Sequence, residues 1–372
     1  MRLKILYDSY IFNYQRYGGI SRYFVDLMEN LPSDFLFEEN VKFTDNVYLK
    51  SSSQFKKVIT LPVNRGKSKV QTALNKPLDI FALQRGKYDL FHPTYYSSYF
   101  IKYLKSPYVI TVHDMIHEKF SSDDETITQK KKSILGANRI IAVSHNTKRD
   151  LIDIYGISPA KIDVVYHGYS FNANIEEPVS LQNHSYILFT GARHGYKNWY
   201  NFVKAFKILN DIYPDIKLVC TGSKFTNEEK DYLVKNKLTE QVLQLFVSDS
   251  QLVWLYKHAI CFVYPSLYEG FGIPILEAFA SGCPLLLSDT SCFPEIAEKG
   301  GLYFNPNDVE SMADSMKRIV EDSALRERLI ANGNLRLKDF SCRKMAEQTA
   351  QIYILKSATI IQYTIKGRFM SR

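Results

Sequence analysis

Short apolar runs alternate with amphipathic stretches along most of the chain. Brief runs rich in β-branched and aromatic residues are typical of buried strands. They cover residues 3–7, 88–92, 108–112, 138–143, 186–190, 216–220, 243–247, 259–264 and 285–288. Helical spacing covers residues 67–84 and 309–320, and helices are also predicted behind Gly19, Ser144, Lys197, Ser248 and Ser341. Alternation of this kind predicts an α/β fold built on parallel sheets.

Two stretches lack this clear alternation. Residues 40–62 predict extended segments with a turn at Asp45 and Asn46. Over residues 169–185 the periodicity vanishes and Asn, Glu, Pro and Ser dominate, which indicates a linker between domains. We therefore expect a first domain over 1–170, a second over 184–345, and a final helix with a basic tail over 346–372.

Residues 263–289, VYPSLYEGFGIPILEAFASGCPLLLSD, carry the strongest signal in the chain. Pro265 ends a buried strand because proline lacks an N–H for the strand ladder. A glycine-containing loop follows, and Pro274 suits the first turn of a helix, where an N–H is not needed. Gly282 ends that helix before the next buried strand. The pattern predicts a strand, loop, helix and strand in parallel arrangement.

Two carboxylates and a helix N-terminus meet in this unit. Glu269 lies in the loop and Glu277 in the first turns of the helix, so both can face the crevice at the carboxyl end of the strand. The backbone amides near Gly272 point into the same crevice, and a helix N-terminus favours an anion such as phosphate. Amides for a phosphate and carboxylates for hydroxyl groups predict a site for a sugar nucleotide.

The segment from Glu269 to Glu277, EGFGIPILE, resembles the E-x7-E motif of retaining glycosyltransferases of family 4, which have the GT-B fold. The alternative for these residues alone is an ordinary βαβ unit with surface glutamates. The resemblance extends to the GGI-x-RY segment at 18–23, the His-Asp pair at 113–114 and the G-x-x-x-x-x-KN pattern at 191–198. It implies two Rossmann-like domains facing a cleft, with a C-terminal helix crossing back to the first domain. The first domain would bind the acceptor and the second the nucleotide sugar.

The resemblance also assigns roles to individual residues. Catalytic roles would fall to His113, Glu269, Arg193 and Lys197, and donor binding to Gly19, Arg193, Lys197, Gly270, Phe271, Gly272, Ile273 and Glu277. Arg193 and Lys197 would hold the diphosphate, Glu277 the ribose, Glu269 the sugar hydroxyls, and His113 the transferred sugar. From the residues alone, the Arg-Lys pair could equally be a solvated basic turn, and the His-Asp pair a loop hydrogen bond. His167 stands where the family usually has asparagine, and we assign no role to it.

No D-x-D motif accompanies these residues, so we expect no metal and no cofactor besides the nucleoside-diphosphate sugar that serves as donor. The resemblance then favours front-face transfer, in which the leaving phosphate oxygen takes the proton of the acceptor hydroxyl. Family likeness points to a glycan or lipid-linked acceptor in bacterial surface polysaccharide synthesis. GDP-mannose is slightly preferred over a UDP-sugar, because GGI-x-RY and TGARHGYKNW look like segments of mannosyltransferases.

Composition narrows the class of protein further. The net charge of +8 suits an anionic substrate or an anionic membrane surface, and no arginine-rich segment indicates a nucleic acid partner. Cys220, Cys261 and Cys283 lie in or beside apolar runs and are expected as buried thiols, which favours a reducing compartment. With no signal peptide and no long apolar run, we expect a cytoplasmic chain.

Several alternatives stay open. The basic tail over 355–372 can bind the inner face of an anionic membrane, and a packed helix with a basic end explains it equally well. An epimerase acting on a UDP-sugar shares this architecture but would need no acceptor. A binding module for nucleotide sugars, without catalysis, is a third class. Turnover of the donor with and without an acceptor distinguishes the three.

Overall fold

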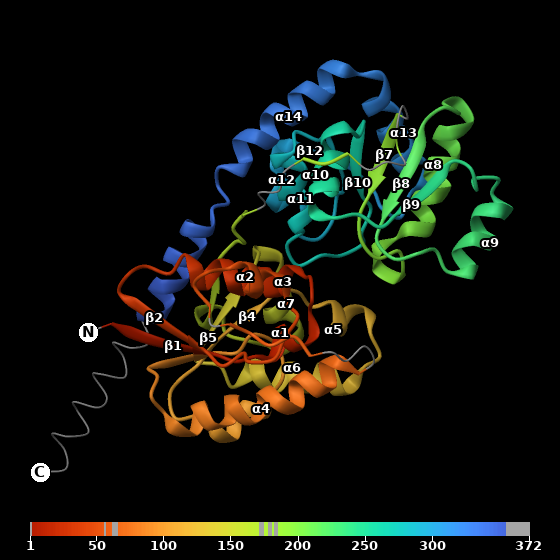
Figure 1. Cartoon of the computed structure of the whole chain (residues 1–372). Helices are drawn as coiled ribbons and strands as arrows, with labels where there is room; N and C mark the ends of the chain where they lie inside the picture. Colours follow the sequence, from red (N-terminus) through yellow and green to blue (C-terminus); the bar gives the residue numbers. More distant parts are fainter. Residues whose placement is uncertain are drawn as a thin grey trace, which may run out of the picture. The chain divides into compact units, whose positions relative to one another are not determined.

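In a computed structural model of the chain, residues 2–55, 57–61, 66–170, 175–177, 181 and 185–354 are described. The chain forms two compact units (Figure 1), of which the first comprises Met1–Gly168 and Ser341–Arg372 and the second Tyr169–Phe340. The basic tail over 355–372 lies outside the described residues. The two units are treated separately below.

The first unit is built on parallel strands. Two three-stranded sheets, β2-β1-β3 and β4-β5-β6, are connected by a bridge between Phe91 and Tyr108. The strands are β1 (Leu3–Tyr7), β2 (Phe35–Glu39), β3 (Leu90–His92), β4 (Val109–Val112), β5 (Arg139–Ala142) and β6 (Ile162–Val164). The helices are α1 (Tyr10–Tyr14), α2 (Gly19–Glu29), α3 (Val47–Ser51), α4 (Lys67–Arg85), α5 (Ile116–Phe120), α6 (Asp124–Leu135) and α7 (His145–Tyr155).

The end of the chain returns to the first unit. Residues 342–354 are helical, and the Ser341 hydroxyl accepts a hydrogen bond from the Lys344 N–H, as expected of a cap. Met345, Ala346 and Tyr353 join the same apolar cluster as residues of β1 (Figure 1). The expected helix that crosses back to the first domain is therefore present.

The second unit holds a six-stranded parallel sheet in the order β12-β11-β10-β7-β8-β9. Its strands are β7 (Tyr186–Phe189), β8 (Lys217–Thr221), β9 (Val242–Leu245), β10 (Cys261–Tyr264), β11 (Leu285–Ser288) and β12 (Gly301–Phe304). The helices are α8 (Trp199–Ile212), α9 (Asn227–Lys235), α10 (Asp249–His258), α11 (Ile273–Ala280), α12 (Phe293–Ala297), α13 (Val309–Glu321) and α14 (Ser323–Leu337).

The buried strands form the core of the second unit, as their apolar sequences predict. All residues of β7, β10 and β11 are buried, and they are covered by apolar side chains of α8 and α13. All five cysteines are buried free thiols, which confirms the prediction made for three of them. Burial raises the pKa of the Cys220 thiol to about 12 and keeps that thiol protonated.

The prediction for residues 40–62 was wrong in one place. Residues 47–51 form α3 instead of an extended segment, because the Asn46 side chain accepts a hydrogen bond from the Leu49 N–H and caps a helical turn. The Asn46 amide also donates to the carbonyl of Gln15, which fixes the turn against the preceding segment. The predicted turn at Asp45 and Asn46 is thus the start of a helix.

Two glycines allow helix α14 to pack closely on α11. A Cβ atom on Gly333 would lie 2.4 Å from Cδ1 of Phe279, and one on Gly300 would lie 2.7 Å from its Cζ. Phe279 is buried, so its ring has little room to move away. The positions of α11 and α14 therefore depend on the absence of side chains at these two glycines.

We predict that Gly333→Ala lowers the free energy of unfolding by about 1–3 kcal/mol, because overpacking outweighs the higher helix propensity of alanine. Urea denaturation of the whole chain measures this change. Adding Phe279→Leu should make the loss of the double variant smaller than the sum of the single losses. Strictly additive losses would contradict the contact.

Candidate functional site

The order of strands in the second unit reverses between β7 and β10. From β7 the sheet continues through β8 and β9 on one side and through β10, β11 and β12 on the other. In open parallel sheets, ligands bind beyond the carboxyl ends of the strands at such a point, since the loops on either side diverge there. The loops that start after Phe189 and after Tyr264 therefore define the candidate site.

These two loops are fastened to each other and to the sheet. The Leu267 N–H donates a hydrogen bond of 2.8 Å to the Tyr196 carbonyl, which joins the loops directly. Asn198 adopts a left-handed conformation with φ of +58° at the start of α8, and its amide donates to the Pro306 carbonyl at 2.7 Å. The backbone on both sides of Lys197 is thus held in place.

The structure brings two of the predicted residues into contact. The Lys197 Nζ lies 2.7 Å from Oε1 of Glu269, and their side chains are 15% and 10% exposed. The ammonium group also lies 5.1 Å and 5.4 Å from the ring centroids of Tyr196 and Tyr264. Burial and the charge of Glu269 raise the pKa of Tyr264 well above its ordinary value, so this phenol stays protonated. Lys197 is therefore an ordered, partly desolvated cation and not part of a solvated turn.

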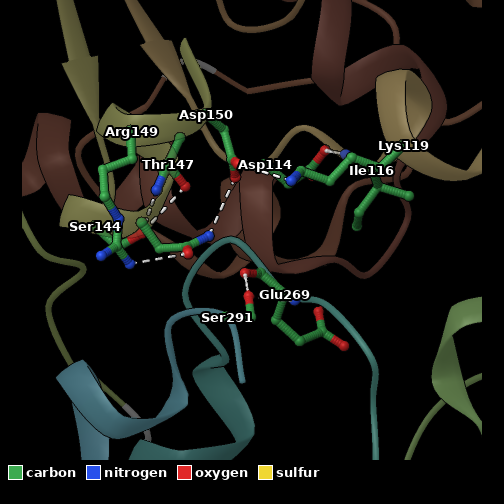
Figure 2. Close-up of polar contacts among 10 residues, drawn as sticks. Asp114, Ile116, Lys119, Ser144, Thr147, Arg149, Asp150, Glu269 and Ser291 are labelled. Carbon is green, nitrogen blue, oxygen red and sulfur yellow. Dashed lines mark hydrogen bonds and ion pairs between the residues drawn. The ribbon is translucent and has the colours of Figure 1, made fainter. Parts of the chain in front are cut away.

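The backbone of Glu269 is fixed by a serine from a separate loop. The Glu269 N–H donates to the Ser291 hydroxyl at 3.0 Å, and that hydroxyl donates to the Glu269 carbonyl at 2.6 Å (Figure 2). Ser291 itself has a φ of +60°. Both backbone polar groups of Glu269 are satisfied, so its carboxylate is held in one direction.

Helix α11 begins directly behind this loop, as predicted. Gly272 has a φ of +87°, a conformation that favours glycine, and no side chain caps the helix start at Ile273. Gly270, Phe271, Gly272 and Ile273 thus form the approach to a helix N-terminus. Such a terminus without a side-chain cap suits an anion. Phe271 is buried, with its ring edge-on to Phe340 at 5.8 Å.

Glu277 lies one turn further along α11 and contacts a buried tyrosine. The Tyr256 hydroxyl donates to Oε2 of Glu277 at 3.2 Å and lies 3.4 Å from Oγ1 of Thr190. Burial, and after it the charge of Glu277, raises the pKa of Tyr256 well above its ordinary value. A protonated phenol thus orients this carboxylate from α10, while Thr190 connects it to the end of β7.

Arg193, which the resemblance assigns to the diphosphate, is buried and paired with an acidic side chain. The side chain is 4% exposed, and its Nε and Nη2 pair with Glu229 at 2.9 Å and 3.2 Å. Nη2 also donates to the carbonyls of Ser223 and Lys224. Within the part of the chain that is described, only Nη1 of this buried guanidinium lacks a hydrogen-bond partner. Nε and Nη2 are therefore used inside the protein, and only the buried NH2 group of Nη1 has no hydrogen-bond partner among the described residues.

In the first unit, His113 follows β4 and is buried among rings. It stacks on His167 with centroids 5.4 Å apart and contacts Tyr23 edge-on at 5.0 Å. Neither ring nitrogen of His113 has a hydrogen-bond partner among the described residues. Burial lowers the pKa of His113 well below its ordinary value, and the neighbouring His167, His92 and Lys130 lower it further. The ring is therefore neutral, with one nitrogen able to donate and one able to accept.

Hydrogen bonds and ion pairs hold the segment that follows His113 in place. Lys130 donates to the Asp114 carbonyl at 2.7 Å and to Oε2 of Glu118 at 2.8 Å. Further along, Lys119 pairs with Asp150 at 2.7 Å (Figure 2). The His113-Asp114 segment is thus held by hydrogen bonds and ion pairs with α6 and α7.

Gly19 begins helix α2, and Ser21 lies inside that helix. The Gln15 side chain accepts the Ser21 N–H at 3.0 Å, which requires Gly18, because a Cβ atom there would lie 2.3 Å from Oε1 of Gln15. Gly18 is thus needed for close approach, and the donor contact expected of Gly19 stays a prediction.

Several residues of these sites gave no clear signal in the sequence. They are Glu229, Tyr256 and Ser291 in the second unit, and His167 in the first. Glu229 could be recognised only as part of a capping box with Thr226, which says nothing about its pairing with Arg193. The unusual histidine before Gly168 was visible, but its stacking on His113 was not.

Comparison with known proteins agrees with this architecture. A family model described as Glycosyltransferase Family 4 matches residues 17–172, and one described as Glycosyl transferases group 1 matches residues 171–336. The O-antigen chain mannosyltransferase RfbU of Salmonella typhimurium is 32% identical over 217 residues, covering 56% of this chain and 60% of that protein. O-antigen chain mannosyltransferase B of Escherichia coli is 28% identical over 240 residues, covering 60% and 62%. The matches thus span about three fifths of the length of these curated relatives.

The solved structures show the same fold. Anabaena HepE, in complex with UDP and glucose, superposes with a TM-score of 0.72 at 18% identity, covering 94% of this chain and 99% of that one. Two units built on parallel sheets, with a helix returning to the first, define a GT-B protein. The chain belongs to the glycosyltransferases of family 4, with a group 1 domain as its second unit.

The described residues also bear on metal binding and on membranes. Within these residues, no three His, Cys, Asp or Glu side chains gather so that they could hold a metal ion. No described helix is both long and apolar enough to cross a membrane. Transfer without a metal stays a prediction.

The buried histidines predict a dependence of stability on pH. Burial lowers the pKa of His167 from 6.5 to about 3. Between these values the unfolded chain binds a proton that the folded chain excludes, so the free energy of unfolding falls as the pH falls from 6.5 towards 3. One such group contributes up to about 1.4 kcal/mol per pH unit.

We predict that His167→Asn flattens this slope below pH 6.5 by about one proton equivalent. Urea denaturation between pH 8 and pH 4.5 measures it, and the comparison of slopes removes any constant effect of the substitution on packing. A slope equal to that of the unchanged chain would contradict the neutral, buried state of His167.

Proposed function

We propose that this chain transfers a hexosyl group from a nucleoside-diphosphate sugar to a hydroxyl group of a glycan or glycolipid, with retention of anomeric configuration. The observation that carries the proposal is the ion pair between Lys197 and Glu269 at the reversal of strand order, beside the start of α11 that no side chain caps. A cation and a helix N-terminus suit a diphosphate, and the two carboxylates suit sugar hydroxyls.

In this proposal each group has one task. Lys197, the amides at Gly270–Ile273 and Nη1 of Arg193 stabilise the charge that develops on the leaving diphosphate. Glu269 binds hydroxyls of the transferred sugar, and Glu277 binds the ribose. The bond from the anomeric carbon to the phosphate oxygen breaks, a bond to the acceptor oxygen forms, and the acceptor proton moves to the leaving phosphate oxygen. The role of His113 towards the transferred sugar rests on the family resemblance.

The ion pair gives the charge of Lys197 a partner inside the protein. Glu269 neutralises Lys197, so the partly buried ammonium is not left unpaired. A diphosphate brings two or more negative charges and competes for that ammonium. Glu269 is then released to accept hydrogen bonds from a sugar.

A mannosyl donor is favoured, with GDP-mannose ahead of UDP-sugars. Two relatives bear the name O-antigen chain mannosyltransferase, which also favours an acceptor in surface polysaccharide synthesis. The structure of HepE with UDP and glucose keeps a UDP-sugar as the second choice. Thermal shift with a panel of UDP- and GDP-sugars selects between them, since a ligand at about 100 times its Kd adds roughly 2.7 kcal/mol.

We predict that Lys197→Ala and Glu277→Ala each reduce transfer by about 100-fold or more, because each removes a fixed charge at the donor. Radiolabelled transfer from the selected donor to a polysaccharide or lipid extract measures this loss, and thermal unfolding checks the fold. Lys207→Ala is the matched control, since Lys207 lies on α8, where its partly exposed side chain pairs with Asp211. Near-normal turnover in both site variants would refute the assignment.

Glu269→Gln separates binding from transfer. Loss of the carboxylate frees Lys197 for phosphate, so we predict about threefold to tenfold tighter binding of the nucleoside diphosphate alone, together with slower transfer. Isothermal titration with UDP and GDP measures the affinity. Weaker binding of the diphosphate would show that Glu269 and the phosphate do not compete for Lys197.

A further inference from the structure

Helix α4 of the first unit presents its apolar side chains to solvent. Val70, Leu74, Leu78 and Phe81 are 38%, 41%, 37% and 64% exposed, and their spacing of four, four and three residues places them in one row. In Figure 1, α4 runs along the outside of its unit. A continuous exposed apolar row on a helix marks a surface that binds something.

The buried face of α4 carries three polar side chains beside Ala82 and Leu83. Gln71, Asn75 and Asp79 are 1%, 0% and 3% exposed. Asn75 accepts the N–H groups of Lys42 and Phe43 and donates to the Phe43 carbonyl at 2.8 Å. The inward face of this helix therefore satisfies backbone groups of the irregular segment around residue 43.

Asp79 adds a second anchor to the same face. It accepts the Ser9 hydroxyl at 2.7 Å and the Ser9 N–H at 3.2 Å, at the end of β1. Turning the helix to hide its apolar row would leave these buried donors and acceptors without partners, which is costly. The exposure of the row is thus imposed by hydrogen bonds of the fold.

The charged side chains that α4 itself exposes are all basic. Lys69, Lys76 and Arg85 are exposed on α4, and Asp79, the only acidic residue of the helix, faces inward. Lys87 follows directly and is exposed as well. An apolar row flanked by cations is the composition of helices that lie in the interface of anionic membranes.

We propose that α4 lies on an anionic lipid surface, with Val70, Leu74, Leu78 and Phe81 among the acyl chains and the flanking basic groups against lipid phosphates. A second copy of this chain fits less well, because pairing of two such faces would bring their cations together. Residues 355–372 fit less well too, since they contain four basic residues and no acidic one. This inference is independent of the donor site and of the proposed transfer reaction.

The test uses the full chain and vesicles of phosphatidylcholine with and without 30% phosphatidylglycerol. We expect sedimentation with the anionic vesicles, and at least tenfold weaker binding by Val70→Ser/Leu74→Ser/Phe81→Ser. Lys69→Glu/Lys76→Glu should also weaken binding, because each basic group near such a surface contributes about fivefold. The matched control is Ile212→Ser/Val234→Ser/Leu335→Ser, which removes apolar side chains that are 52%, 62% and 62% exposed in the second unit. That control should bind like the unchanged chain.

Further measurements give the results that would overturn the proposal. A chain that ends at residue 354 should keep most of its binding to anionic vesicles. If this truncation abolishes binding while the α4 variant binds normally, the tail is the contact with the membrane. Light scattering reports self-association: a dimer that the α4 variant dissociates, without any binding to vesicles, assigns the row to a second copy. The membrane proposal is also overturned if the unchanged chain does not bind to anionic vesicles.

Thermal unfolding and nucleotide-sugar binding of the α4 variant should be unchanged. Failure of the membrane proposal is therefore distinct from failure of the proposed function.

Discussion

The pairing of β7 with both β8 and β10 is the constraint on which the candidate site depends. Parallel strands require long crossovers, and all their carboxyl ends meet at one edge of the sheet. When the order of strands reverses at β7, the crossovers leave in opposite directions and their loops cannot fill the space between them. Lys197 and Glu269, 72 positions apart, therefore come within 2.7 Å. Strand order thus explains their contact better than either loop does alone.

Contacts around Lys197 and Glu269 keep this arrangement rigid. Asn198 is bound to Pro306, Leu267 to Tyr196, and the backbone of Glu269 to Ser291. Such contacts hold charged groups in place before a ligand arrives, so less reorganisation is needed when charge develops on a leaving group. Arg193 is held in the same way by Glu229, although its fork is then used inside the protein. The site consists of a few charged groups on a scaffold of neutral hydrogen bonds.

The sequence predicts the parts of this structure that depend on neighbouring residues. Strands with apolar runs, the turn at Gly272, Pro274 in the first turn of α11, and the cap at Ser341 were all recognisable. Residues 47–51 were misjudged because their helix depends on the side chain of Asn46. The pairing of Arg193 with Glu229 could not be predicted, since it joins the loop after β7 to helix α9, which only the folded sheet brings together. The same limit applies to His113 and His167, which stack only when β4 and the segment after β6 are adjacent.

Helix α4 shows why helical spacing alone does not reveal which face is buried. Its apolar residues form a regular row, and a prediction from hydrophobic spacing alone would place that row in the core. The opposite face instead holds Asn75 and Asp79, whose partners are backbone groups at residues 42–43 and at Ser9. The N–H groups of Lys42 and Phe43 are not taken up by the bridge between Phe43 and Ile59, and the Ser9 N–H lies beyond the end of β1, so side chains of α4 satisfy them inside the protein. The need to satisfy buried backbone groups therefore decides the orientation of α4, and the exposed apolar row is its consequence.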